Sequence, residues 1–161
     1  MTATPLQMAL VGATIANDGV MMEPFAVREI RTPDLSGNPG TVTATYSSPG
    51  RRTVVSPLTA EQVRGVMVDA VHGPLGAPYA GAGNVANYGI GGVQTAGKTG
   101  TAERGDGLPP HSWFIGFVAA EPGATPSIAV AVIVEGAGAG SATAAPIGGR
   151  VMAEWLRLIG S

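Results

Sequence analysis

Three apolar stretches in the second half of the chain carry the residue pattern of β-strands. They cover residues 94–102, 113–120 and 127–135, and each is bounded by residues that favour turns. The connecting segments are short and rich in glycine and proline. Such links suit antiparallel neighbours, because a parallel pair needs a crossover of about a dozen or more residues. The pattern therefore predicts one antiparallel sheet with the strands in chain order.

Apolar residues at helical spacing predict three helices. The first starts at Thr4, an N-cap residue followed by proline, and its broad apolar coverage predicts that it is mostly buried. Gly19 is able to take the left-handed conformation that ends this helix. The second helix begins with a capping-box pattern at residues 59–62 (TAEQ) and stops at residues 73–74 (GP). The third covers residues 146–159.

The remaining segments predict a hairpin and a loop. Residues 25–30 and 41–46 read as two strands on either side of a segment, 32–40, that is rich in turn residues. Residues 73–92 are dense in glycine, alanine and asparagine and predict a loop. Helices combined with antiparallel strands place the chain in the α+β class.

Composition narrows the possible functions. The chain has 161 residues, of which 45% are hydrophobic and only 12% charged, so we expect one domain-sized core and an unusually neutral surface that something else partly covers. A net charge of −2 argues against nucleic-acid binding. Without cysteine, and with two histidines, the chain offers no thiol nucleophile and too few ligands for a histidine-rich metal site, and we expect neither metal nor cofactor.

One short motif is ambiguous. Residues 92–99 (GVQTAGKT) satisfy the phosphate-loop pattern G-x-x-x-x-G-K-[ST]. A phosphate loop must open a helix, whose N-terminus supplies the anion site. The glycines and prolines of residues 100–110 disfavour a helix there. Nucleotide binding is therefore the distant alternative.

The same residues suit a different chemistry if they lie on a strand. Side chains alternate along a strand, so Lys98 and Gly100 share one face, and Thr99 and Thr101 share the other. Gly100 lets a ligand lie flat, and the free backbone of an edge strand pairs with extended peptides. Lysine and hydroxyl groups can bind a carboxylate, and a backbone N–H can stabilise an oxyanion. A surface strand with a chance lysine remains the alternative at this point.

Four segments in order along nearly the whole chain resemble the transpeptidase domain of class B penicillin-binding proteins. They are residues 4–9 with 16–19 (TPLQMA, ANDG), 96–103 (AGKTGTAE), 111–117 (HSWFIGF) and 144–147 (AAPI). The resemblance implies a β-lactamase/transpeptidase-like fold, with helices on both faces of the sheet and the K-T-G-T strand at its outer edge beside the catalytic cleft. It also implies that the strand at 127–135 is central and pairs with a strand from outside this chain.

The activity that the resemblance implies is D,D-transpeptidation of peptidoglycan. A serine attacks a stem peptide that ends in D-Ala-D-Ala, and β-lactams acylate the same serine. By position, Lys98 would polarise the hydroxyl network and attract the substrate carboxylate, and Thr99 and Thr101 would bind that carboxylate. The N–H of Thr101 would form half of the oxyanion hole, and Gly100 would keep the floor clear. The implied location is the extracytoplasmic face of the bacterial membrane, with an anchor outside this chain.

The chain departs from the family pattern in one respect. It contains neither S-x-x-K nor S-x-N: its only lysine is Lys98, and position 95 is threonine. We therefore expect residues 1–161 to be the C-terminal portion of a transpeptidase domain that needs an N-terminal part carrying both motifs. The isolated chain is then inactive. A non-catalytic scaffold or binding module remains the alternative.

Overall fold

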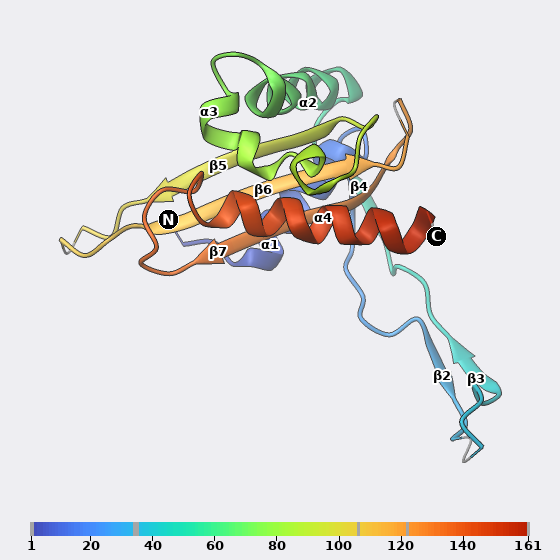
Figure 1. Cartoon of the computed structure of the whole chain (residues 1–161). Coiled ribbons are helices and arrows are strands. Elements are labelled where there is room, and N and C mark those ends of the chain that lie inside the picture. The colour runs from blue at the N-terminus through green and yellow to red at the C-terminus, as the bar shows by residue number, and fades with distance from the viewer. Residues whose placement is uncertain (1, 34–35, 106, 122, 161) are drawn as a thin grey trace.

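A three-stranded antiparallel sheet forms the centre of the computed structural model, which describes residues 2–33, 36–105, 107–121 and 123–160. The sheet has the order β5-β6-β7, with β5 at Thr95–Ala102, β6 at His111–Ala119 and β7 at Pro126–Val134 (Figure 1). The predicted sheet and strand order are confirmed. In the described part of the chain no strand covers the outer side of β5 or of β7.

Helices cover both faces of this sheet (Figure 1). On one face, α4 (Ala144–Gly160) contacts β6 and β7, and on the other α1 (Pro5–Ala16) contacts β7 and β6. The helix α2 (Pro57–His72) lies along β5. Phe114 and Phe117, three residues apart on β6, point to opposite faces and are buried in separate clusters. The α+β fold with helices on both faces is confirmed.

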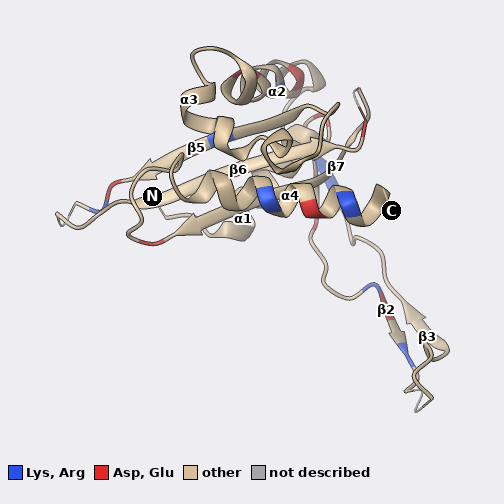
Figure 2. Ribbon diagram, in the orientation of Figure 1, with Lys and Arg blue, Asp and Glu red and all other residues tan. Residues whose placement is uncertain are grey.

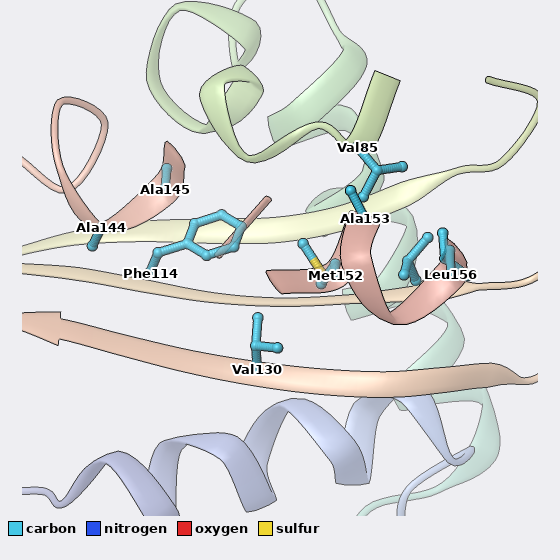
Figure 3. Close-up of a cluster of buried hydrophobic side chains, with 9 residues drawn as sticks. Val85, Phe114, Val130, Ala144, Ala145, Met152, Ala153 and Leu156 are labelled. Atoms are coloured by element: carbon cyan, nitrogen blue, oxygen red, sulfur yellow. The ribbon is translucent and has the colours of Figure 1, made fainter. Parts of the chain in front are cut away.

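The larger cluster lies between the sheet and α4, as Figure 3 shows. Its buried members come from β6, β7, α4 and a short helical turn: Val85, Phe114, Val118, Val130, Ala144, Ala145, Met152, Ala153 and Leu156. The smaller cluster joins the other face to α1 and α2 through Ala16, Met67, Ala96 and Phe117. Because Ala96 is a residue of β5, this second core holds the beginning of that strand.

Two expectations for the helices are corrected. The cap of α2 is Ser56, whose Oγ accepts the N–H of Thr59, so the helix starts earlier than the TAEQ pattern predicts. Proline is suited to the first helical position because its missing N–H is not needed there. The expected burial of α1 is wrong, because only Gly12, Thr14 and Ala16 are buried. The helix packs on the sheet and also contacts β1 (Val20–Met22) and α2, while its first residues, 5–7, are exposed.

The predicted hairpin exists but has shorter strands. β2 (Glu29–Arg31) pairs antiparallel with β3 (Val42–Thr45), and together they form an arm that projects from the body (Figure 1). Residues 34 and 35 of the expected turn lie outside the described residues. A second pair, β1 (Val20–Met22) with β4 (Arg51–Thr53), forms the base of this arm and was not predicted.

The segment after α2 is helical where a loop was predicted. It forms α3 (Ala77–Ala80) and two 3-10 turns, η1 (Gly81–Gly83) and η2 (Val85–Tyr88). Its small residues let it pack closely beneath α4, where Gly83 and Val85 are buried. Among the described helices, none is long and apolar enough to cross a membrane.

Candidate functional site

The residues K-T-G-T lie on the edge strand β5. Lys98 and Thr101 are exposed, and Thr99 and Gly100 are half-buried. Because Lys98 lies within a strand and no helix begins there, the phosphate-loop alternative is wrong. The three strands of the sheet contain one charged residue, Lys98, and Figure 2 shows that charge gathers instead on α2, α4 and the hairpin. The site therefore has a single cation on an otherwise uncharged sheet.

The Lys98 side chain folds back along its own strand. Its Nζ donates to the carbonyl oxygen of Thr99 at 2.7 Å. In the register of β5 with β6, Lys98 lies opposite Ile115, Gly100 opposite Trp113, and Thr101 opposite Ser112. The ammonium group is thus held close to the K-T-G-T backbone, where an anionic ligand lying along the strand would meet it.

The backbone of β5 also exposes hydrogen-bond donors. The N–H of Thr95 donates to Nε2 of His72 on α2 at 3.2 Å, so it points away from β6. Successive residues of a strand direct their N–H groups to alternate edges, and the β5–β6 register runs without a shift from Thr95 to Ala102. The N–H groups of Thr99 and Thr101 therefore point to the same outer edge. This edge combines a cation, two hydroxyl groups and two outward N–H groups.

The loop that follows β7 supports the K-T-G-T strand from the α4 side. A Cβ on Gly140 would lie 2.6 Å from the carbonyl oxygen of Gly100 and 2.3 Å from that of Trp113, so only glycine fits. Ser112 holds the same loop, because its Oγ donates to the carbonyl of Ala139 and accepts the N–H of Ala144. The sequence did not reveal the roles of Gly140 and Ser112, because no local pattern indicates that the loop after β7 contacts β5 and β6.

Two cavities lie away from this edge. One of about 510 Å³ lies between α1, α2 and the sheet and is lined by Asp18, Glu61, Arg64 and Asp69 among others. A second, of about 450 Å³, lies between α1 and the start of β7. Neither is lined by residues of the K-T-G-T run, which forms an open edge. Within the described residues, no group of three or more His, Asp or Glu side chains could hold a metal ion.

Comparison with known proteins gives a consistent picture. The family model of the penicillin-binding protein transpeptidase domain matches residues 1–153. Peptidoglycan D,D-transpeptidase PbpA of Mycolicibacterium smegmatis is 43% identical over 164 residues, which cover 96% of this chain and 29% of that protein. PbpA of Mycobacterium tuberculosis is 40% identical over 159 residues, covering 92% of this chain and 28% of that protein. The chain thus spans less than a third of the length of these relatives.

Solved structures agree with the sequence relatives. The D,D-transpeptidase domain of a peptidoglycan glycosyltransferase from Eggerthella lenta has a TM-score of 0.67 at 30% identity, over 98% of this chain and 32% of that one. Penicillin-binding protein 3 of Mycobacterium tuberculosis, complexed with aztreonam, has a TM-score of 0.69 at 27% identity, over 98% and 35%. Fold and sequence therefore agree that this chain belongs to the family of penicillin-binding protein transpeptidase domains, of the class B type.

Proposed function

We propose that the protein containing this chain is a peptidoglycan D,D-transpeptidase, and that residues 1–161 form the C-terminal portion of its catalytic domain. The observation that carries the proposal is the position of Lys98–Thr101 on an open edge strand whose outer N–H groups are available to a peptide. The relatives named as D,D-transpeptidases support the reaction type. The nucleophilic serine is supplied by a part of the protein outside these residues.

Each residue of the run has a role in this reaction. A stem peptide that ends in D-Ala-D-Ala lies along the outer edge of β5, with its terminal carboxylate at Lys98, Thr99 and Thr101. The serine oxygen attacks the penultimate carbonyl, and the N–H of Thr101 stabilises the developing oxyanion. D-Alanine leaves with a proton on its nitrogen, and the amine of a second stem peptide releases the acyl group. Gly100 leaves the strand surface open for the substrate.

β-Lactams are the second ligand class that we assign to this edge. The Mycobacterium tuberculosis neighbour is a complex with aztreonam, a property of that protein that supports the assignment here. A β-lactam offers a carbonyl and an anionic group in the same arrangement as the peptide terminus, so it needs the same donors. Because stem peptides are crosslinked outside the cytoplasm, we place the protein at the extracytoplasmic face of the cell membrane, held by an N-terminal segment outside these residues.

The proposal is tested by Lys98→Ala in the full-length protein. Loss of the ammonium group removes one donor to the developing charge, which costs on the order of 3 kcal/mol, or roughly a hundredfold to a thousandfold in rate. We expect the second-order rate of acylation by a fluorescent penicillin to fall by that factor. The melting temperature should hardly change, because an exposed lysine contributes little to stability. Lys98→Arg should retain part of the rate, since a planar fork replaces a compact charge.

A matched control is Arg51→Ala, which removes an exposed cation on β4, away from the site. This variant should react at the unchanged rate. An unaltered rate for Lys98→Ala at an unaltered melting temperature would remove Lys98 from the site. Failure of the unmodified full-length protein to form any penicillin adduct would instead favour a non-catalytic binding module.

A further inference from the structure

Ser112 carries a fully buried hydroxyl group on β6, on the α4 side of the sheet. It lies opposite Thr101 in the register of β5 with β6. Its Oγ donates to the carbonyl oxygen of Ala139 at 3.0 Å and accepts the N–H of Ala144 at 3.1 Å. The hydroxyl group is therefore engaged, as donor and as acceptor, by the backbone of one segment that runs from the end of β7 to the start of α4.

These bonds hold Gly140, which directly follows Ala139 and is buried. The carbonyl oxygen of Ala139 also accepts the N–H of Ala142 at 3.1 Å. On the other side, the carbonyl oxygen of Gly140 accepts the N–H of Ala145, in the first turn of α4, at 2.9 Å. The backbone is thus tied on both sides of Gly140, by Ser112 and by the beginning of α4.

Gly140 packs against one hydrogen-bonded pair of the sheet. The N–H of Thr95 points to the outer edge, so by alternation that of Gly100 points inward, and Gly100 exchanges both backbone hydrogen bonds with Trp113. A Cβ on Gly140 would lie 2.3 Å from the carbonyl oxygen of Trp113, 2.6 Å from that of Gly100 and 2.9 Å from the Gly100 nitrogen. Contacts this close leave room for a hydrogen atom only. Gly140 therefore limits the movement of this pair toward α4.

The contact reaches the proposed oxyanion donor through a single peptide group. The carbonyl of Gly100 and the N–H of Thr101 belong to one planar unit, and in a trans peptide they point in opposite directions. No described residue has a cis peptide bond. The carbonyl points to β6 and the N–H to the outer edge, so a tilt of the plane moves both. Whatever fixes the Gly100 carbonyl also aims the Thr101 N–H.

We propose that Ser112 is a positioning residue for the N–H of Thr101. It holds Gly140 against the Gly100 carbonyl and thereby keeps the shared peptide group aimed at the oxyanion. The inference rests on the proposed transpeptidase function. An oxyanion develops only during the reaction, so loss of this aim lowers the rate of the chemical step and leaves the initial binding of a β-lactam unchanged.

The variant Ser112→Ala tests this proposal in the full-length protein. It removes the donor to Ala139 and the acceptor of the Ala144 N–H without adding an atom. Because small misplacements at a reacting centre are costly, we expect the acylation rate constant at saturating penicillin to fall by roughly tenfold. The half-saturating concentration and the final amount of adduct should not change. An unchanged rate constant, or a smaller amount of adduct formed at the unchanged rate, would overturn the proposal.

The carbonyl of the acyl-enzyme gives a spectroscopic reading of the same N–H. A hydrogen bond polarises an ester carbonyl and lowers its infrared stretching frequency. With a penicillin labelled with ¹³C at the reacting carbonyl, the band should lie at higher frequency in Ser112→Ala than in the unmodified protein. A band at the unchanged frequency would mean that the Thr101 N–H still meets the carbonyl, and would overturn the positioning role.

Thr143 provides a matched control in the same segment. Its Oγ1 donates to the carbonyl oxygen of Ala137 at 3.3 Å, so it also ties this segment but makes no bond to Ala139 or Ala144. Thr143→Val removes that bond with almost no change of shape and should keep the rate constant and the infrared band of the unmodified protein. An equal fall in this variant would assign the effect to the segment as a whole and overturn the specific role of Ser112.

Gly140→Ala approaches the same peptide group from the other side. Its added Cβ must displace the Gly100 carbonyl or the segment itself, so the rate constant should fall here too. Because both changes act through one contact, the double variant with Ser112→Ala should lose clearly less than the product of the two factors. Losses that multiply would show two independent effects and overturn the proposed path.

The NMR signal of the Thr101 amide separates this inference from the proposed function. It should shift in Ser112→Ala and stay constant in Thr143→Val, and no reaction is needed to observe it. If the full-length protein forms no penicillin adduct, the transpeptidase proposal fails while this comparison still decides the contact. A Thr101 signal that stays constant in Ser112→Ala would overturn the positioning role.

Discussion

The ring of Phe114 is enclosed by glycines from four elements. A Cβ added at Gly83, Gly97, Gly116 or Gly148 would lie 2.5, 2.7, 2.7 or 2.4 Å from a ring atom, and these glycines belong to η1, β5, β6 and α4. The Phe114 ring thus occupies the space that side chains at these four glycine positions would otherwise fill. Gly97 directly precedes Lys98, so the packing around this ring also sets the distance between the K-T-G-T strand and the core.

At this scale we predict that Gly148→Ala destabilises the protein. The added methyl group overpacks the Phe114 pocket, which typically costs about 1–3 kcal/mol, and the loss is measured by urea unfolding. In a double variant with Phe114→Leu the two losses should not add, because the smaller side chain makes room for the methyl group. The control is Gly65→Ala on α2, where a Cβ meets nothing within 4 Å. That change should stabilise by about 0.5–1 kcal/mol. Strict additivity at Gly148 and Phe114 would contradict this account.

The start of α2 is set by its N-cap residue and not by the helix propensity of the residues that follow. Pro57 follows the cap Ser56, and the Ser56 Oγ also contacts the Oγ1 of Thr59 at 2.8 Å. Both Ser56 and Thr59 are N-cap residue types in the sequence. The proline at the next position distinguishes Ser56, because it suits the first turn and no later one.

We predict that Ser56→Ala destabilises the protein by about 1 kcal/mol, the usual value for losing an N-cap. Thr59→Ala should change the free energy of unfolding by less than about 0.5 kcal/mol, because threonine within the first turn caps nothing and alanine favours helix. Thermal or urea unfolding of both variants is the measurement. Equal losses would mean that the cap is shared between the two hydroxyl groups.

Across the whole molecule, apolar side chains remain uncovered beside an open strand. On α4, Ile147, Val151, Trp155 and Leu158 are 41%, 46%, 37% and 65% exposed. Their spacing places them on one stripe, and the Nε1 of Trp155 donates to Ser127 on β7. The stripe therefore adjoins the strand whose outer edge is unpaired in the described chain. Few charges counteract this, since only 12% of residues are charged.

From this surface we predict that residues 1–161 expressed alone self-associate, because open strand edges and apolar patches favour association. Light scattering should show species larger than a monomer. The same material should form no adduct with fluorescent penicillin on a denaturing gel, because it contains no S-x-x-K serine. A labelled band from the isolated chain would contradict the assignment of the nucleophile to another part of the protein.

The sequence by itself determined the strand order, the hairpin, the position of the first helix and the placement of K-T-G-T on a strand. The type of each element depends on neighbours two to four residues apart, and the pairing of consecutive strands follows from the shortness of their links, so the residue pattern records both. Only the tertiary structure decided that the Thr99 and Thr101 N–H groups point outward, that His72 receives the amide of Thr95, and that Gly140 meets Gly100. Each of these is a contact between segments distant in the chain. The short helices after α2 and the exposure of α1 belong to the same class, because what covers a segment depends on the packing of the whole fold and leaves no local pattern.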